Sequence, residues 1–214
     1  MRAVFRLLAW IALIVAALVG LLRLTAIRWW RLPSSDAYLA ASVEPSLRGG
    51  DLILLWRFTK PKFGDLVLCP EPKHPERVVI ARIAGEQGDN VKLKGSELRV
   101  NDRRARTDQN CSEPKFSSRD PATGIAVEQH CQMEELGGGT HLRGGVEGHP
   151  KQPLEVAQNV PPGHLYLVSD NRLFPYDSRD FGPVEATSCT ETVFFRLVSR
   201  GGFFDAKNRF TFVR

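Results

Sequence analysis

Histidine and cysteine are the residue types in this chain that could bind a metal ion, and the sequence holds five of the first and four of the second. None of them forms the C-x-x-C or H-x-x-x-H pair that is typical of a metal site. His130 and Cys131 are neighbours in a polar stretch and are interpreted as loop residues. Gly137 to Gly139 lack a predicted strand before them and a helix after them, so they indicate a linker rather than a phosphate-binding loop. The sequence therefore predicts neither a metal site nor a cofactor.

Ser42 has the best context for chemistry. It opens the run S-V-E-P-S-L at 42–47, which follows an apolar N-terminal segment and leads into an apolar, strand-like run. A serine hydroxyl is a weak nucleophile at neutral pH and needs a base beside it. In Ser-Lys enzymes that base is a lysine kept neutral by burial.

Four blocks in this order, the last of them in two parts, resemble the signal peptidase I family, whose members are membrane-anchored serine endopeptidases that cut secretory signal peptides. The run at 42–47 is similar to the family's Ser-Met-x-Pro-Thr-Leu motif, and F-G-D-L-V at 63–67 continues the likeness. R-I-A-G-E-Q-G-D at 82–89 resembles Lys-Arg-Val-Ile-Gly-x-x-Gly-Asp. S-D-N-R at 169–172 and D-S-R-D-F-G at 177–182 resemble Gly-Asp-Asn-Arg and Asp-Ser-Arg-x-x-Gly.

The resemblance implies that Ser42 is the nucleophile and that Val43 and Pro45 line the substrate cleft. It also places the lysine base directly before the arginine of the third block, where this chain has Ala81. The hydroxyl that would hydrogen-bond the lysine corresponds to Pro175. The base and its partner are thus absent together, and loss of the base in a serine hydrolase can cost as much rate as loss of the whole catalytic set.

Three explanations of Ala81 stay open. The alanine is an engineered change that traps a substrate, or another lysine reaches Ser42, or the chain is a natural relative that no longer cleaves. Lys92 and Lys94 follow most closely in sequence, but their place at a strand edge indicates solvated charges. Changes such as Val43 for methionine are tolerable, because the two side chains pack alike.

The resemblance also implies an active-site motif made of Asp170, Asn171, Arg172, Asp177, Ser178 and Arg179. Its charges are chemically more suited to buried ion pairs than to proton transfer. We therefore expect these residues to support the loop near Ser42.

Residues 7–27 form an apolar run interrupted by Arg23, long enough for a helix that crosses a bilayer, and Trp29 and Trp30 suit the headgroup zone. A cleavable signal peptide is the main rival, but no small-x-small site follows the run. Residues 1–31 are interpreted as a single-pass membrane anchor. Arginines flank the run on both sides, so the positive-inside rule does not orient it.

The rest of the chain predicts a mostly β fold with an antiparallel sheet, because short apolar runs alternate with Gly-Asp, Pro and Asn-Asp turns. We expect the β core to combine residues 32–102 and 159–214. Residues 103–158 show little periodicity and are interpreted as a partly flexible insertion or cap.

The four cysteines allow three complete pairings. Cys111 and Cys131 lie in the polar insertion, where a disulfide would compensate for a missing local core. Cys69 and Cys189 lie at apolar strand-like runs and are expected to be core thiols. The first pair is the disulfide candidate.

The net charge of +5 is confined to the N-terminus, because five arginines precede the first acidic residue and the remaining 24 basic residues equal the acidic ones in number. Such a balanced body predicts no nucleic-acid partner. The leading hypothesis is a signal-peptidase-I-like enzyme that cleaves signal peptides of exported proteins after a small residue, with its body on the extracytoplasmic side. Its partners would be preproteins and membrane lipid. The alternative is an impaired or inactive relative that binds peptides or assists assembly.

Overall fold

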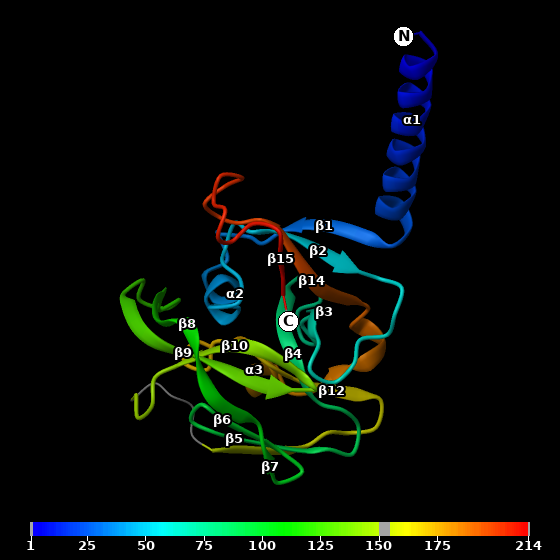
Figure 1. Cartoon of the computed structure of the whole chain (residues 1–214). Helices are drawn as coiled ribbons and strands as arrows, with labels where there is room; N and C mark the ends of the chain where they lie inside the picture. The colour runs from blue at the N-terminus through cyan, green and yellow to red at the C-terminus, as the bar shows by residue number, and fades with distance from the viewer. Residues whose placement is uncertain (1, 150–154, 214) are drawn as a thin grey trace.

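An apolar helix, α1 (Arg2–Thr25), projects from a β-rich body in the computed structural model, which describes residues 2–149 and 155–213 (Figure 1). The stretch Val4–Arg23 is long and apolar enough to cross a membrane, and none of it is buried against the body. The prediction that the helix continues through Ile27 was wrong. Strand β1 (Ile27–Arg31) begins there because its backbone pairs with β2.

The main sheet of the described chain has eight antiparallel strands, in the order β1-β2-β14-β3-β4-β12-β13, with β15 paired to β14. Segments from both ends of the chain therefore meet in one sheet. The prediction of a mostly β fold with an antiparallel sheet is confirmed. The strands after β1 are β2 (Leu52–Trp56), β3 (Leu66–Pro70), β4 (Val78–Gly85), β12 (His164–Val168), β13 (Val184–Glu185), β14 (Glu191–Val198) and β15 (Thr211–Phe212).

Two smaller sheets complete the body. One has the order β11-β5-β6-β7 and the other β10-β9-β8. Their strands are β5 (Asn90–Lys94), β6 (Glu97–Val100), β7 (Arg103–Arg104), β8 (Arg106–Arg119), β9 (Ala126–Leu136), β10 (Gly139–Gly145) and β11 (Val156–Asn159). In Figure 1, β5, β6 and β7 lie at the end of the body farthest from α1.

The sequence predicted no strands within 103–158, and the structure corrects this. Several inward positions of the sheet β8–β10 are polar, including Gln129, Glu134 and His141, each at most 3% exposed. A half-buried strand is predicted from the alternation of apolar and polar residues along it. Because polar residues occupy both faces of these strands, the alternation is missing from their sequence.

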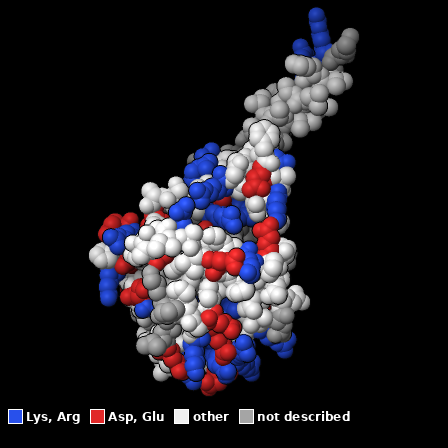
Figure 2. Space-filling model, turned by 90° about the vertical axis from the view of Figure 1, so that its left-hand side faces the viewer, with Lys and Arg blue, Asp and Glu red and all other residues white. Residues whose placement is uncertain are grey.

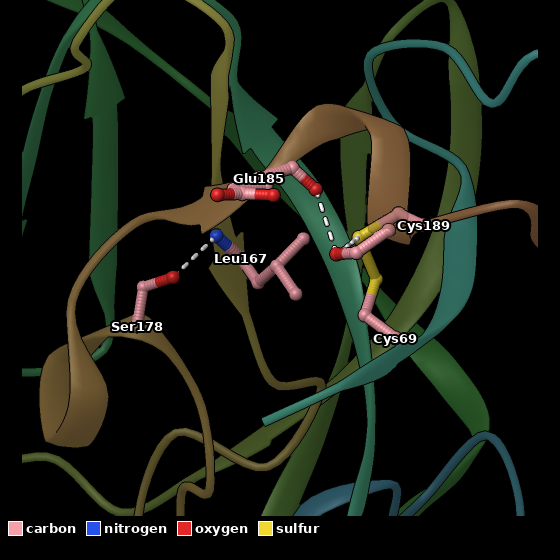
Figure 3. Close-up of a disulfide and its surroundings, with 6 residues drawn as sticks. Cys69, Leu167, Ser178, Glu185 and Cys189 are labelled. Atoms are coloured by element: carbon pink, nitrogen blue, oxygen red, sulfur yellow. Dashed lines mark hydrogen bonds between the residues drawn. A yellow bond between two sulfur atoms is a disulfide. The ribbon is translucent and has the colours of Figure 1, made fainter. Parts of the chain in front are cut away.

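The main sheet packs one face against a short helix, α2 (Ala37–Ser42), through an apolar cluster that includes Leu39, Val43, Ile53 and Ile80. A second cluster contains Val67, Ala81 and a disulfide between Cys69 and Cys189 (Figure 3). The expectation of two free core thiols was therefore wrong. Cys69 lies near the end of β3 and Cys189 shortly precedes the neighbouring β14, so their Cα atoms lie 4.6 Å apart.

Candidate active site

Ser42 is the last residue of α2, and the local sequence explains why the helix is short. The Asp36 carboxylate caps its N-terminus by accepting a hydrogen bond from the Leu39 amide at 3.0 Å. Leu39 and Val43, four residues apart, turn into the core. The chain then leaves the helix at the Glu44-Pro45 step, since proline disfavours helical backbone in the residue before it.

The Ser42 side chain is enclosed. The residue has no exposed surface, and its hydroxyl donates a hydrogen bond to the Leu39 carbonyl at 3.0 Å. Within residues 2–149 and 155–213, no lysine or histidine hydrogen-bonds to that hydroxyl. The carbonyl of Ser42 accepts a hydrogen bond from the Asn171 amide at 2.9 Å, which ties the helix end to the S-D-N-R motif.

Asn171 anchors the motif to α2 through its side chain as well. Its Nδ2 donates to the Ala41 carbonyl at 2.9 Å, and its Oδ1 accepts from the amides of Leu173 and Phe174. Since Asn171 is fully buried, each of these polar groups would lose its partner without access to water if the side chain were removed. The structure thus brings two of the sequence-predicted segments together.

Ala81 lies on β4, opposite Val67 in β3, and is fully buried in the apolar cluster around the Cys69 disulfide. Helix α2 contacts the same strand. Lys92 and Lys94 lie on β5 in a different sheet, where Lys92 pairs with Asp102 at 2.7 Å. Neither lysine contacts Ser42.

The charged motif residues form buried ion pairs. The Asp170 carboxylate accepts two hydrogen bonds from the Arg82 guanidinium, at 2.7 and 3.2 Å. Asp177 accepts from Arg179 in the same forked manner, at 2.9 and 2.7 Å, and from the Ser169 amide. Burial raises the pKa of Asp177, but Arg179 and these amide hydrogen bonds lower it overall. The carboxylate is therefore held in its charged form.

Ser178 hydrogen-bonds to strand β12 and forms no hydrogen bond with Ser42. Asp177 caps the short helix α3 (Ser178–Phe181), and the Ser178 hydroxyl accepts a hydrogen bond from the Leu167 amide at 2.9 Å. Figure 3 shows this bond reaching the edge of β12, in the neighbourhood of the Cys69–Cys189 disulfide. Ser178 therefore fixes α3 against the main sheet.

Sequence reasoning missed a buried group on the small sheet. Glu134 of β9 pairs with Arg172, and His141 of β10 lies 3.2 Å from the same carboxylate. Burial raises the pKa of Glu134, but Arg172, His141 and Arg143 outweigh it and lower the value to about 2. No pattern in the sequence distinguishes these residues from the exposed polar ones beside them.

The sheet β8–β10 covers the serine segment. The Ser46 hydroxyl donates to the Leu142 carbonyl at 3.2 Å, and Asn171 Nδ2 lies 3.3 Å from the hydroxyl of Ser118 in β8. Gly144 of β10 is so close to Phe116 and Pro45 that an added Cβ would collide with the phenyl ring. A disulfide joins Cys111 of β8 to Cys131 of β9 within this cover.

Pro45 lines a cavity of about 520 Å³ beside this disulfide, together with Ser46, Arg48 and Phe116. Val43 is buried in the core. No group of three or more histidine, cysteine, aspartate or glutamate side chains in the described ranges is arranged to hold a metal ion.

The comparisons with known proteins agree on one family. The family model described as signal peptidase, peptidase S26, matches residues 5–198. Signal peptidase I V of Bacillus subtilis is 27% identical over 148 residues, which cover 67% of this chain and 73% of the relative. Signal peptidase I of Streptococcus pneumoniae serotype 4 is 24% identical over 203 residues, 87% of this chain and 92% of the relative.

A signal peptidase I from Enterococcus faecalis V583 is a similar solved structure, with a TM-score of 0.41 and 19% identity over 63% of this chain and 97% of that one. The described protein is a mostly antiparallel β-sheet body with an apolar N-terminal helix, and its serine segment is tied to a buried charged motif. With the family model matching most of its length, the chain belongs to the signal peptidase family, peptidase S26. The resemblance predicted from the sequence is confirmed.

Proposed function

We propose that this chain acts on the signal peptides of exported preproteins as a membrane-anchored serine endopeptidase, with Ser42 as nucleophile. The observation that supports it most is the family match over residues 5–198, which includes both the Ser42 segment and the motif around Asn171. Cleavage falls after a small residue of the preprotein, and α1 anchors the body on the extracytoplasmic side of the cell membrane.

The reaction proceeds through an acyl-enzyme. The Ser42 oxygen attacks the scissile carbonyl carbon, the peptide nitrogen leaves with a proton, and water then hydrolyses the serine ester. The proton of the Ser42 hydroxyl points to the Leu39 carbonyl, which holds the hydroxyl but is no base at neutral pH. With Ala81 where the family has lysine, cleavage is much slower than in a relative with that lysine.

The motif residues act by position. Asn171 fixes the helix end that carries Ser42, while the pairs of Asp170 with Arg82 and Asp177 with Arg179 hold the Asn171 loop. Residues 103–158 contribute a cap, and the peptide binds as an extended strand near Val43 and Pro45 once the cover over Ser42 opens.

The surroundings of Ala81 are the reason for keeping a second function as the alternative. The side chain is fully buried among apolar residues, and the Ser42 hydroxyl has no surface exposed to solvent. Such a site retains the shape of the family fold without its proton acceptor. In this second case the chain binds signal peptides, or assists their assembly, and does not cut them.

Incubation of the full-length protein in detergent with a preprotein separates the two functions. The test compares the unmodified chain with Ser42→Ala, measuring both cleavage and binding of the preprotein. Slow cleavage that disappears in Ser42→Ala supports the endopeptidase. Equal preprotein binding by both forms, without cleavage, supports the second function. If the unmodified chain neither binds nor cleaves the preprotein, both proposed functions are contradicted.

A further inference from the structure

Arg143 is a buried cation without a directly paired carboxylate among the described residues, although Glu134 and Glu147 lie close enough to act on its charge. It lies on β10 and is 6% exposed. Its terminal nitrogens donate to two neutral acceptors, the Ser96 carbonyl and the Gln132 side-chain oxygen. Among the described residues its Nε has no hydrogen-bond partner, and no carboxylate forms an ion pair with it.

A buried guanidinium with an unpaired N–H group lowers the stability of the folded protein unless another group supplies a hydrogen-bond acceptor. Arginine carries five N–H donors, of which the two described bonds use two. Burial lowers the pKa of Arg143, and the charges of Glu134 and Glu147 oppose this shift only in part.

Arg143 lines a cavity of about 540 Å³ between β6, β7 and the start of β8. Lys94 and Arg106 stand at this cavity, are exposed, and form no ion pair within the described chain. Arg104 also lines it but shares the Glu97 carboxylate with Arg99. Glu97 and Glu147 also line the cavity, but the four cations outnumber these two carboxylates, and three of the four form no ion pair within the described chain.

We propose that this cavity binds an oxyanion, a phosphate or carboxylate group of a ligand from solution, with Arg143 as the buried anchor and Lys94 and Arg106 at the mouth. Arginine at a buried position suits such a group, because its planar donors can bind two oxygens at once. A lipid headgroup is the other source of this chemistry. The β6–β7 end of the body lies away from α1 in Figure 1, which favours a soluble ligand.

The cavity is also connected to the serine segment. Arg143 directly precedes Gly144, whose amide donates to the Asp170 carbonyl and whose own carbonyl accepts from the Arg172 amide. Asn171, which lies between Asp170 and Arg172, donates its backbone amide to the Ser42 carbonyl. A ligand that fixes Arg143 would therefore stabilise the strand against which the motif is built.

The experiment measures binding of inorganic phosphate to the full-length protein in neutral-detergent micelles, by calorimetry and by thermal unfolding at constant ionic strength. We expect saturable binding and a rise in the unfolding temperature. The double variant Lys94→Gln with Arg106→Gln changes only exposed side chains, so it should fold, and we expect its affinity to fall by about tenfold or more. Arg143→Met should abolish binding if it folds.

Lys60→Gln is the matched control, because it removes an exposed positive charge that does not line this cavity and should leave phosphate affinity unchanged. No saturable binding by the unmodified chain would overturn the proposal, as would equal affinity in the double variant and the control. A further arm adds an anionic phospholipid to the micelles. Displacement of phosphate by that lipid would overturn the assignment of a soluble ligand. Phosphate binding that is undiminished in the presence of the lipid supports that assignment.

Discussion

At the scale of single residues, the site differs from the family pattern in what surrounds one hydroxyl. Ser42 lies at the end of a capped helix, and its carbonyl accepts a hydrogen bond from the Asn171 backbone amide. The resemblance predicts that Ala81 stands where the family has its lysine, so this position would supply a methyl group in place of an amine. On this prediction, the replacement would remove proton transfer to the base, while peptide binding would depend on other groups.

Restoring the lysine gives a direct test. We expect Ala81→Lys alone to raise preprotein cleavage only partly, because Pro175 offers no hydroxyl to aim the amine. Together, Ala81→Lys and Pro175→Ser should raise the rate by more than the two single changes combined, and Ser42→Ala should remove the gain. Because position 81 is fully buried, the lysine should also lower stability by about 1–3 kcal/mol.

The gain in cleavage is measured by initial rates, and the loss of stability by chemical denaturation. Strong Ser42-dependent cleavage by the unmodified chain would show that another residue serves as base. Additive single changes would show that Pro175 and Ala81 act independently.

Asn171→Ala should destabilise the protein by about 2–4 kcal/mol, since it leaves buried amides and the Ala41 carbonyl without partners. Urea denaturation checks this. Asn110→Ala, an exposed position on β8, is the control and should change stability by less than about 0.5 kcal/mol. Equal effects in the two variants would argue against Asn171 as the link between α2 and its loop.

At the scale of elements, the sheet β8–β10 joins the charged motif to the serine segment. Its strands contribute Glu134 to Arg172, Gly144 to the Asp170 loop and Leu142 to Ser46. The sheet is itself crossed by the disulfide between Cys111 and Cys131. A disulfide within the cover and a buried ion pair to the motif thus stabilise the closed arrangement over Ser42.

The two disulfides should differ in their contribution to stability. They close loops with sequence separations of 20 and 120 residues, and a longer loop loses more entropy on cross-linking in the unfolded chain. We expect the pair Cys69→Ala and Cys189→Ala to cost roughly 1–2 kcal/mol more than Cys111→Ala and Cys131→Ala. Denaturation midpoints measure the difference, and a larger cost for the short loop would contradict the prediction.

The Glu134 carboxyl should make stability depend on acid pH. Its pKa is lowered to about 2 in the folded protein by Arg172, His141 and Arg143, despite burial, whereas an unfolded glutamate titrates near pH 4.3. A lowered pKa means that the stabilisation is present above the unfolded value and is lost as pH falls toward the folded one. The loss should therefore occur between about pH 5 and pH 2.

Glu134→Gln is the variant that isolates this carboxyl. We expect it to be less stable than the unmodified chain at pH 7, with the difference shrinking as pH falls through that window. Glu135→Gln, at the exposed neighbouring position, is the matched control. A difference that stays constant from pH 7 to pH 2 would show that the Glu134 charge does not stabilise the fold.

At the scale of the whole molecule, the apolar and charged parts are separated. Helix α1 carries no acidic side chain and projects from the body, and Figure 2 shows Lys and Arg side chains at the end of the body from which it leaves. The Arg23 guanidinium lies over the Trp29 ring, 4.7 Å from its centre, at this junction. Such an arrangement suits a helix in hydrocarbon with its junction among headgroups.

The full-length protein should accordingly remain with membranes after washing with high salt and alkali. Leu13→Arg combined with Leu18→Arg should release it, because each arginine costs about 2.5–3.5 kcal/mol near the middle of a spanning helix. Ile125→Arg, at an exposed site on the body, should not. Immunoblots of the membrane and soluble fractions measure the outcome, and release of the intact unmodified chain would contradict the anchor.

The sequence by itself determined the family, the mostly β fold and the apolar helix, because these depend on local patterns: ordered motifs, short alternating runs and a long uncharged stretch. It also gave the prediction that Ala81 replaces the family's lysine, which the activity measurements above test. Tertiary structure alone decided what those patterns cannot encode. The pairing of Cys69 with Cys189 depends on two neighbouring strands that are 120 residues apart in sequence. Glu134 and Arg143 look like surface charges in the sequence, and only the packing of β9 and β10 buries them, since burial depends on what the rest of the chain places around a residue.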